Sequence, residues 1–69
     1  MARSVALFSE NDERVLKYWN VDVDVCGSHT VIYRKHENIR FCDEIDYVKL
    51  VQHKTVVFFK SGWYLVVIR

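Results

Sequence analysis

The sequence predicts an α+β domain in which one short N-terminal helix packs on an antiparallel meander sheet or small open β-barrel of about five or six strands. Two observations predict the sheet: 51% of the residues are hydrophobic, and they gather in short β-branched runs separated by polar turns. A serine followed by an acidic segment predicts the helix. Because the chain has 69 residues, we expect residues 1–69 to form a single small domain.

The run from Thr55 to Ile68 is the most apolar part of the sequence, and we expect the rest of the chain to pack on it. Its two arms flank Lys60-Ser61-Gly62, which has the composition of a turn, so the run predicts a tight β-hairpin. Neither arm alternates apolar with polar residues, which indicates that both faces are covered. A chain of this length buries only about 60% of its unfolded surface. We therefore expect another molecule to supply part of that cover.

Residues 10–19 predict the short helix. Ser9 offers a side-chain oxygen as N-cap, and the acidic residues that follow it favour the positive end of a helix dipole. Apolar residues at 15, 16 and 19 fall on one side of a helix. The alternative is a hairpin that turns at Glu10-Asn11-Asp12, and the sequence favours it less because the apolar residues after the turn do not alternate with polar ones.

The remaining segments predict strands. Val21 to Val25 places valines on one face and aspartates on the other, which is typical of a strand with one solvated side. Further strands are predicted at residues 4–8, 30–34 and 39–41. Residues 42–52 fit either a strand or a helix, and their β-branched content favours the strand.

Charge and cysteine content exclude several classes of protein. The formal net charge of +1 argues against a polyanion binder held by bulk charge. Cys26 and Cys42 are too few for the disulfide framework of a small secreted domain. No signal peptide or membrane-spanning run is apparent. We therefore expect a cytoplasmic protein with no membrane partner.

No constellation of residues predicts chemistry. Cys26 and His29 have the spacing of half a zinc site, but His36 and Cys42 are too widely spaced to complete it. Neither cysteine forms a recognised catalytic signature with a histidine. Two glycines cannot make a glycine-rich phosphate loop. We expect no catalytic residues, no metal and no cofactor, and hence a protein that is not an enzyme.

The composition favours a non-enzymatic protein–protein interaction module. We expect a homodimer, or a small inhibitor or adaptor that docks on a larger protein, as is typical of phage and mobile-element accessory proteins. Aromatic side chains are enriched at binding hot spots, and free strand edges accept further strands. The residues expected to bind the partner lie in the C-terminal hairpin: Phe58, Phe59, Trp63 and Tyr64.

The alternative is a small nucleic-acid-binding module that uses basic and aromatic sheet residues. A stacking platform with phosphate contacts needs such residues to be interleaved. The basic residues expected to contact nucleic acid are Arg34, Lys35, Arg40, Lys54 and Lys60.

One segment resembles known families. From Asn38 to Val66 the chain reads as strand, acidic turn, Ile-Asp-Tyr-Val, polar turn, Val-rich strand, glycine turn and strand. This order resembles the core strands of LytTR-type DNA-binding domains and of bacterial pleckstrin-homology-like domains. The resemblance spans less than half of the chain and is a pattern that many meanders share, so it transfers neither a residue role nor membership of a family.

Overall fold

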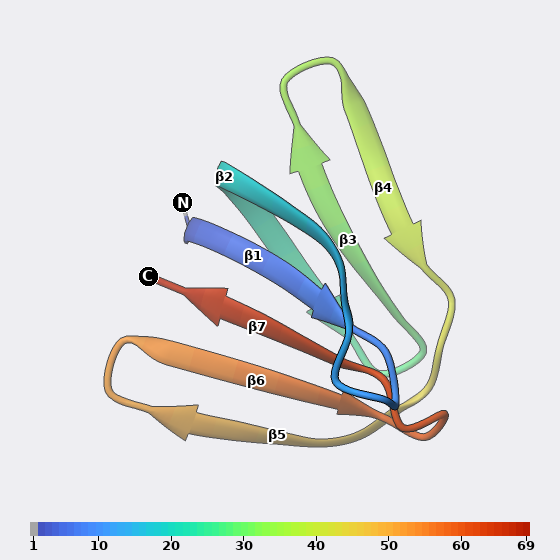
Figure 1. Cartoon of the computed structure of the whole chain (residues 1–69). Helices are drawn as coiled ribbons and strands as arrows, with labels where there is room; N and C mark the ends of the chain where they lie inside the picture. Colours follow the sequence, from blue (N-terminus) through green and yellow to red (C-terminus); the bar gives the residue numbers. More distant parts are fainter. Residues whose placement is uncertain (1) are drawn as a thin grey trace.

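The computed structural model describes residues 2–69, which form seven strands and no helix. The strands are β1 (Ala2–Phe8), β2 (Arg14–Cys26), β3 (His29–Arg34), β4 (Glu37–Phe41), β5 (Ile45–Val51), β6 (Lys54–Phe59) and β7 (Tyr64–Ile68). They make one antiparallel sheet in the order β4-β3-β2-β1-β7-β6-β5. Figure 1 shows β1, β7, β6 and β5 side by side, while the β3–β4 hairpin turns away from them. The sheet is therefore strongly rolled.

The predicted N-terminal helix is wrong, and the fold is all-β rather than α+β. Ser9 does bind backbone N–H groups as a cap would, because its Oγ accepts hydrogen bonds from Asn11 at 3.3 Å and Glu13 at 3.4 Å. The same residues close a hairpin turn, in which the N–H of Asp12 donates to the carbonyl of Ser9 at 3.0 Å. Asp12 is left-handed with φ 63°, a conformation common in tight hairpin loops. The hairpin that the sequence favoured less is the one that forms.

The helix was predicted because the first half of β2 does not alternate apolar with polar residues in sequence. Some of its apolar side chains lie on the solvent-exposed face of the strand. Leu16 and Tyr18 pack against the core, whereas Lys17 and Trp19 belong to the opposite face. Trp19 is 61% exposed, and the ammonium of Lys17 lies 4.3 Å from the centre of its ring. An apolar residue at a solvated position breaks the binary pattern from which strands are recognised.

The strands predicted elsewhere are confirmed, including the strand interpretation of the segment that contains β5. The C-terminal hairpin is also confirmed as β6 and β7, joined through Gly62 at φ 96°. The sheet has seven strands rather than about five or six, because every predicted strand joins it. β2 also extends back to Arg14, through the segment predicted as a helix.

A left-handed residue bends β2 and so allows the sheet to roll. Asn20 has φ 54°, and at this point the core-facing positions change from the even residues Leu16 and Tyr18 to the odd residues Val21 and Val23. The second half of β2 pairs with β3, and the first half pairs with β1. One strand thereby contributes to both halves of the sheet.

The core lies on the inner face of the rolled sheet. Its buried members come from β1, β2, β3, β6 and β7: Ala2, Val5, Leu7, Val21, Ile32, Val57, Phe59, Leu65 and Val67. The two edge strands, β4 and β5, are joined by residues 42–44. The N–H of Ile45 donates to the carbonyl of Gly27 at 3.2 Å, which holds the start of β5 near the β2–β3 turn. In residues 2–69 no segment forms a helix long and apolar enough to cross a membrane.

Candidate functional site

The register of the sheet places fifteen side chains in three rows on its outer face, which we define as the side of β2, β1, β7, β6 and β5 opposite the core. Directly opposed residues on neighbouring antiparallel strands point to the same face. The first row is Arg14, Phe8, Tyr64, Phe58 and Tyr47; the second is Lys17, Ala6, Val66, Val56 and Lys49; the third is Trp19, Ser4, Ile68, Lys54 and Val51.

Four rings of the first row contact one another in sequence, as two stacked pairs joined by a tilted contact, and we call them the aromatic row. Phe8 and Tyr64 have ring centroids 5.0 Å apart with planes 8° from parallel, and Tyr47 and Phe58 lie 4.5 Å apart at 17°. The Phe58 and Tyr64 rings link the two pairs at 5.7 Å. Because the rings of each stacked pair face each other, one face of every ring in the row is already in contact with its neighbour.

The second row forms the floor of a groove. Its three central side chains are small or branched, with Ala6 and Val56 each 8% exposed, and they lie between the aromatic rings of the first row and the larger third-row side chains Ile68 and Lys54. Two open hollows lie along this floor and share Lys54, Tyr64 and Val66 in their walls. We call their union the outer groove. Since it crosses five strands at a spacing of about 4.8 Å, its length is about 19 Å.

Basic side chains surround the outer groove. Lys17 and Lys49 lie at the two ends of its floor, and Arg14 and Lys54 lie in the rows on either side. Asp12 is the one acidic residue among those that line the groove within residues 2–69. The groove therefore has an apolar floor and a basic rim, which matches a ligand with both apolar and anionic groups.

Asp12 is bonded to the aromatic row. The hydroxyl of Tyr64 donates to Oδ1 of Asp12 at 2.7 Å. This hydrogen bond raises the pKa of Tyr64 above the ordinary value of 10.0. Burial of the hydroxyl and the negative charge of Asp12 are smaller causes of the same shift. Tyr64 is therefore a neutral hydrogen-bond donor at neutral pH.

The residues predicted to bind a protein partner divide between the two faces of the C-terminal hairpin. Phe58 and Tyr64 belong to the aromatic row, and both are partly exposed. Phe59 is buried in the core, and Trp63 is partly buried against it. The structure thus brings two of the four together on the outer face, and the role of all four stays a prediction.

The residues predicted to contact nucleic acid do not gather in one place. Arg34 and Lys35 lie at the β3–β4 turn with His36 and Glu37, and Arg40 lies on β4. Lys60 lies in the β6–β7 turn, with its ammonium 3.9 Å from a carboxylate oxygen of Glu44. Only Lys54 lines the outer groove.

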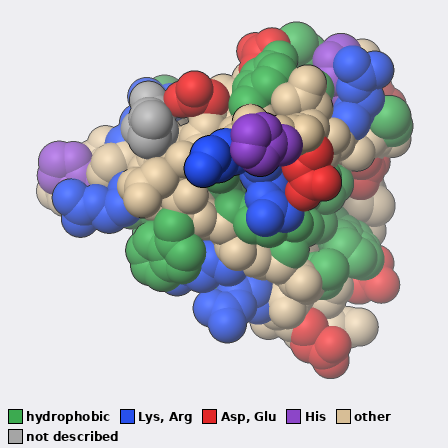
Figure 2. Space-filling model, turned by 90° about the horizontal axis from the view of Figure 1, so that it is seen from above, with side chains coloured by type: hydrophobic (Ala, Val, Ile, Leu, Met, Phe, Trp, Pro, Cys, Tyr) green, Lys and Arg blue, Asp and Glu red, His purple; other side chains and the backbone are tan. Residues whose placement is uncertain are grey.

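Sequence reasoning missed several side chains of the outer face. These are Phe8, Arg14, Lys17, Trp19 and Tyr47. Part of the signal was present, because a hairpin turning at Gln52-His53 sets Tyr47 opposite Phe58. The other part depends on the pairing of β1 with both β2 and β7, which no local pattern reveals. Figure 2 shows hydrophobic side chains in separate patches among charged ones, as seen from above.

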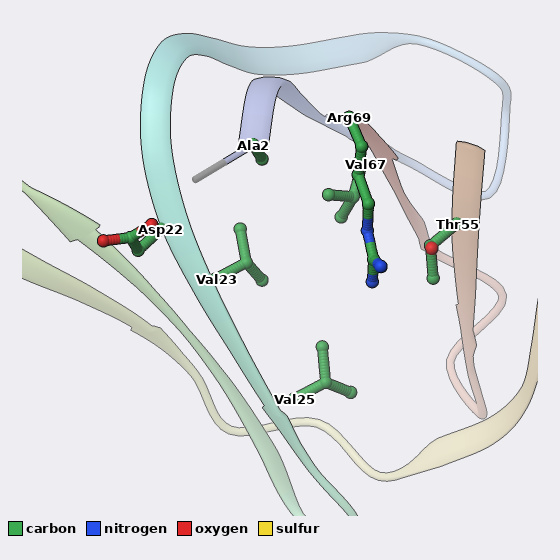
Figure 3. Close-up of a pocket in the computed structure, with 7 residues that line it drawn as sticks. All are labelled: Ala2, Asp22, Val23, Val25, Thr55, Val67 and Arg69. Carbon is green, nitrogen blue, oxygen red and sulfur yellow. The ribbon is translucent and has the colours of Figure 1, made fainter. Parts of the chain in front are cut away.

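The inner face has a cavity of a different kind. It is lined by Ala2, Val23, Val25, Thr55 and Val67, together with Asp22 and Arg69. Figure 3 shows the guanidinium of Arg69 directed into the cavity and the carboxylate of Asp22 directed away from it. None of the residues predicted to bind a partner or nucleic acid lies in this cavity.

Within residues 2–69, no three His, Cys, Asp or Glu side chains gather as a metal site would require. Cys26 is partly buried and Cys42 is exposed, and both are free thiols. Cys26 is paired with His29 across the β2–β3 turn.

No protein-family model, curated protein or solved structure matches this chain.

Proposed function

We propose that this protein is a non-enzymatic binding module and that its outer groove holds an acidic, partly apolar segment of a larger protein. The observation that carries the proposal is the combination of an apolar floor with four basic side chains, Arg14, Lys17, Lys49 and Lys54, against the single acid Asp12. A groove of about 19 Å spans about six residues of an extended peptide.

Charge argues against a second copy of this face as the occupant. Two outer grooves placed against each other would bring the rims of Lys17, Lys49 and Lys54 close together. Like charges in an interface cost several kcal/mol, on the order of 2 to 5. Acidic side chains would instead pair with these cations, while apolar side chains between them cover Val56 and Val66.

The arrangement of the aromatic row favours a peptide over bases. Base stacking needs exposed ring faces, and the faces of Phe8, Tyr64 and Phe58 are turned toward one another. The outward face of Tyr47 lies at the sheet edge, and the ring of Trp19 is already in contact with the ammonium of Lys17. Ring edges and branched aliphatic side chains suit the apolar side chains of a peptide.

Fluorescence anisotropy with three labelled probes tests the proposal. The probes are an extended peptide of alternating glutamate and leucine, the same peptide with glutamine for glutamate, and a single-stranded oligothymidine. We expect the glutamate peptide to bind at least about tenfold more tightly than the glutamine peptide, which corresponds to about 1.4 kcal/mol. Equal binding of the two peptides, or binding of neither, would contradict the proposal.

Charge-reversal variants locate the site. Lys17→Glu and Lys49→Glu lie at the two ends of the groove floor, and each should weaken binding of the glutamate peptide by about tenfold. Lys35→Glu makes the same charge change at the β3–β4 turn and should leave binding unchanged. Equal effects at all three positions would show a response to net charge rather than to the groove.

Nucleic acid is the second candidate, because four cations on one face also suit a phosphate backbone. Oligothymidine bound through Z phosphates loses affinity with salt at a slope of about −0.7Z. Nucleic acid would be the ligand if oligothymidine bound more tightly than the glutamate peptide. In that case the dependence of its affinity on salt should also be weaker in Lys17→Glu than in the unmodified chain.

A further inference from the structure

The two edges of the sheet differ sharply in how they meet solvent. The β5 edge carries four large apolar side chains that are exposed, namely Tyr47 at 54%, Val48 at 44%, Leu50 at 74% and Val51 at 46%. Tyr47 and Val51 lie on the outer face, while Val48 and Leu50 lie on the inner face opposite Val57 and Thr55. Each face of this edge strand therefore carries two large apolar side chains that are uncovered.

The β4 edge has the features that block strand pairing. Its polar residues Glu37, Asn38 and Arg40 are exposed, and its two apolar residues, Ile39 and Phe41, pack against the core. Glu37 also accepts a hydrogen bond from Arg34 at 2.7 Å. Charged side chains are a usual defence of edge strands against pairing with another chain. β5 also has two exposed charged residues, Asp46 and Lys49, but its other exposed side chains are large and apolar.

We propose that β5 pairs antiparallel with β5 of a second copy of this chain, across a two-fold axis that passes through Val48. The pairing joins two sheets into one and satisfies the backbone groups on the free edge of β5. It also brings Val48 of the two copies together and sets the exposed ring of Tyr47 in each copy beside Lys49 of the other. The interface is isologous, so the same residues contribute from both chains.

The residues of β5 select this register. With Val48 opposite itself, Tyr47 lies opposite Lys49 of the second copy on the outer face, and Leu50 lies opposite Asp46, next to the irregular pairing between Ile45 and Tyr47. A register centred on Lys49 sets two ammonium groups directly opposite each other, which is destabilising. A register centred on Tyr47 sets Val48 opposite Asp46 and Leu50 opposite Glu44, so more apolar side chains meet acids there than in the register centred on Val48.

The contact between Tyr47 and Lys49 uses a ring face that is free in one copy. Tyr47 ends the aromatic row at the sheet edge, so its inner face stacks on Phe58 and its outer face meets solvent. A lysine ammonium over a tyrosine face is attracted by the ring quadrupole. Lys17 already makes this contact with Trp19 within one chain, at 4.3 Å.

Disulfide trapping tests the register. In a background of Cys26→Ser and Cys42→Ser, Val48→Cys places two thiols across the two-fold axis. Opposed residues of an antiparallel pair have Cα atoms about 4.5–5.5 Å apart, within the range that a disulfide spans. We expect oxidised Val48→Cys to run as a covalent dimer on a non-reducing gel. Asn38→Cys, on the β4 edge in the same background, should stay monomeric.

Sedimentation tests the dimer itself. The unmodified chain should sediment as a dimer at micromolar concentration, and the double variant Val48→Lys, Leu50→Lys should sediment as a monomer. Both positions are already exposed, so the circular dichroism spectrum of the double variant should match that of the unmodified chain. Lys17→Glu, which changes the outer groove, should remain dimeric, so failure of the groove proposal and failure of this one are distinguishable.

Two results would overturn the inference. One is an unmodified chain that stays monomeric at high micromolar concentration. The other is a Val48→Cys variant that forms no more covalent dimer than Asn38→Cys does. If Val48→Cys fails to cross-link and the double variant Val48→Lys, Leu50→Lys still forms a dimer, the interface lies on another surface.

Discussion

The hydroxyl of Tyr64 donates a 2.7 Å hydrogen bond to Asp12, and this bond joins the β1–β2 loop to the first residue of β7. Asp12 adopts a left-handed backbone with φ 63°, which aspartate tolerates better than most residues. The loop therefore holds its carboxylate at the rim of the outer groove. The bond fixes Asp12 beside the aromatic row, and within residues 2–69 Asp12 is the one acid that lines the outer groove.

Replacing Asp12 by asparagine should lower the pKa of Tyr64 toward the ordinary tyrosine value. Asparagine keeps the left-handed backbone and can still accept the hydrogen bond, but it carries no negative charge to oppose the phenolate. Ultraviolet absorbance of tyrosinate, followed against pH, measures the change. Subtracting the titration of Tyr64→Phe isolates the contribution of Tyr64. An unchanged titration in Asp12→Asn would show that Asp12 does not set this pKa.

The same bond predicts how stability depends on pH. The pKa of Tyr64 is raised in the folded protein. The stabilisation that the Tyr64 hydroxyl gives to the folded state is therefore complete below the pKa of an unfolded tyrosine, about 10. It is lost as the pH rises through the folded pKa. The difference in unfolding free energy between the unmodified chain and Tyr64→Phe should therefore be constant near neutral pH and shrink in alkaline solution. A difference that grows with pH would contradict the assignment.

The left-handed backbone of Asn20 predicts an unusual order of substitutions. With φ 54°, Asn20→Gly should leave the free energy of unfolding within about 0.5 kcal/mol, whereas Asn20→Val should lower it by about 1–3 kcal/mol. Urea denaturation measures both. Asn38→Val, at an ordinary strand position of β4, should cost less than about 0.5 kcal/mol. A tolerated Asn20→Val would mean that β2 bends without this residue.

Local pattern was enough to predict most strands but not the segment after Ser9. Val21 to Val25 and the C-terminal hairpin have strong β signals, and both form strands. Ser9 and the acids after it have the chemistry of a helix start, yet backbone N–H groups of a turn use a serine oxygen equally well. What decides for a strand is the pairing of β2 with β1 and β3. This tertiary pairing overrides local propensity.

The outer groove could be predicted only in part, for a related reason. A hairpin with a known turn fixes its own register, so the opposition of Phe58 and Tyr64 follows from the turn at Gly62. Lys17 and Lys49 lie at opposite ends of the groove because β1 pairs with both β2 and β7. That pairing joins the two ends of the chain, and no short-range pattern encodes it.

The two tryptophans should differ widely in their effect on stability. Trp63 packs against the core and lines a hollow with Leu7, Phe41 and Phe59, so Trp63→Ala should lower the unfolding free energy by about 3 kcal/mol. Trp19 is 61% exposed, and Trp19→Ala removes mainly its contact with Lys17, worth about 0.5–1 kcal/mol. Urea denaturation of both variants gives the comparison. Similar losses would mean that Trp19 is covered in the folded protein, for example by a partner.

The hydroxyl of Thr30 predicts a stabilising substitution. Thr30 is fully buried on β3, and its Oγ1 has no hydrogen-bond partner among residues 2–69. Threonine and valine have nearly the same shape, and a buried polar group without a partner costs about 1–3 kcal/mol. Thr30→Val should therefore raise the free energy of unfolding by about 1 kcal/mol, as measured by urea denaturation. Thr30→Ser keeps the hydroxyl and deletes a methyl group, so it should lower stability by about 1 kcal/mol. If Thr30→Val lowered the free energy of unfolding more than Thr30→Ser does, the result would contradict this prediction. It would mean that the Thr30 hydroxyl has a hydrogen-bond partner in solution.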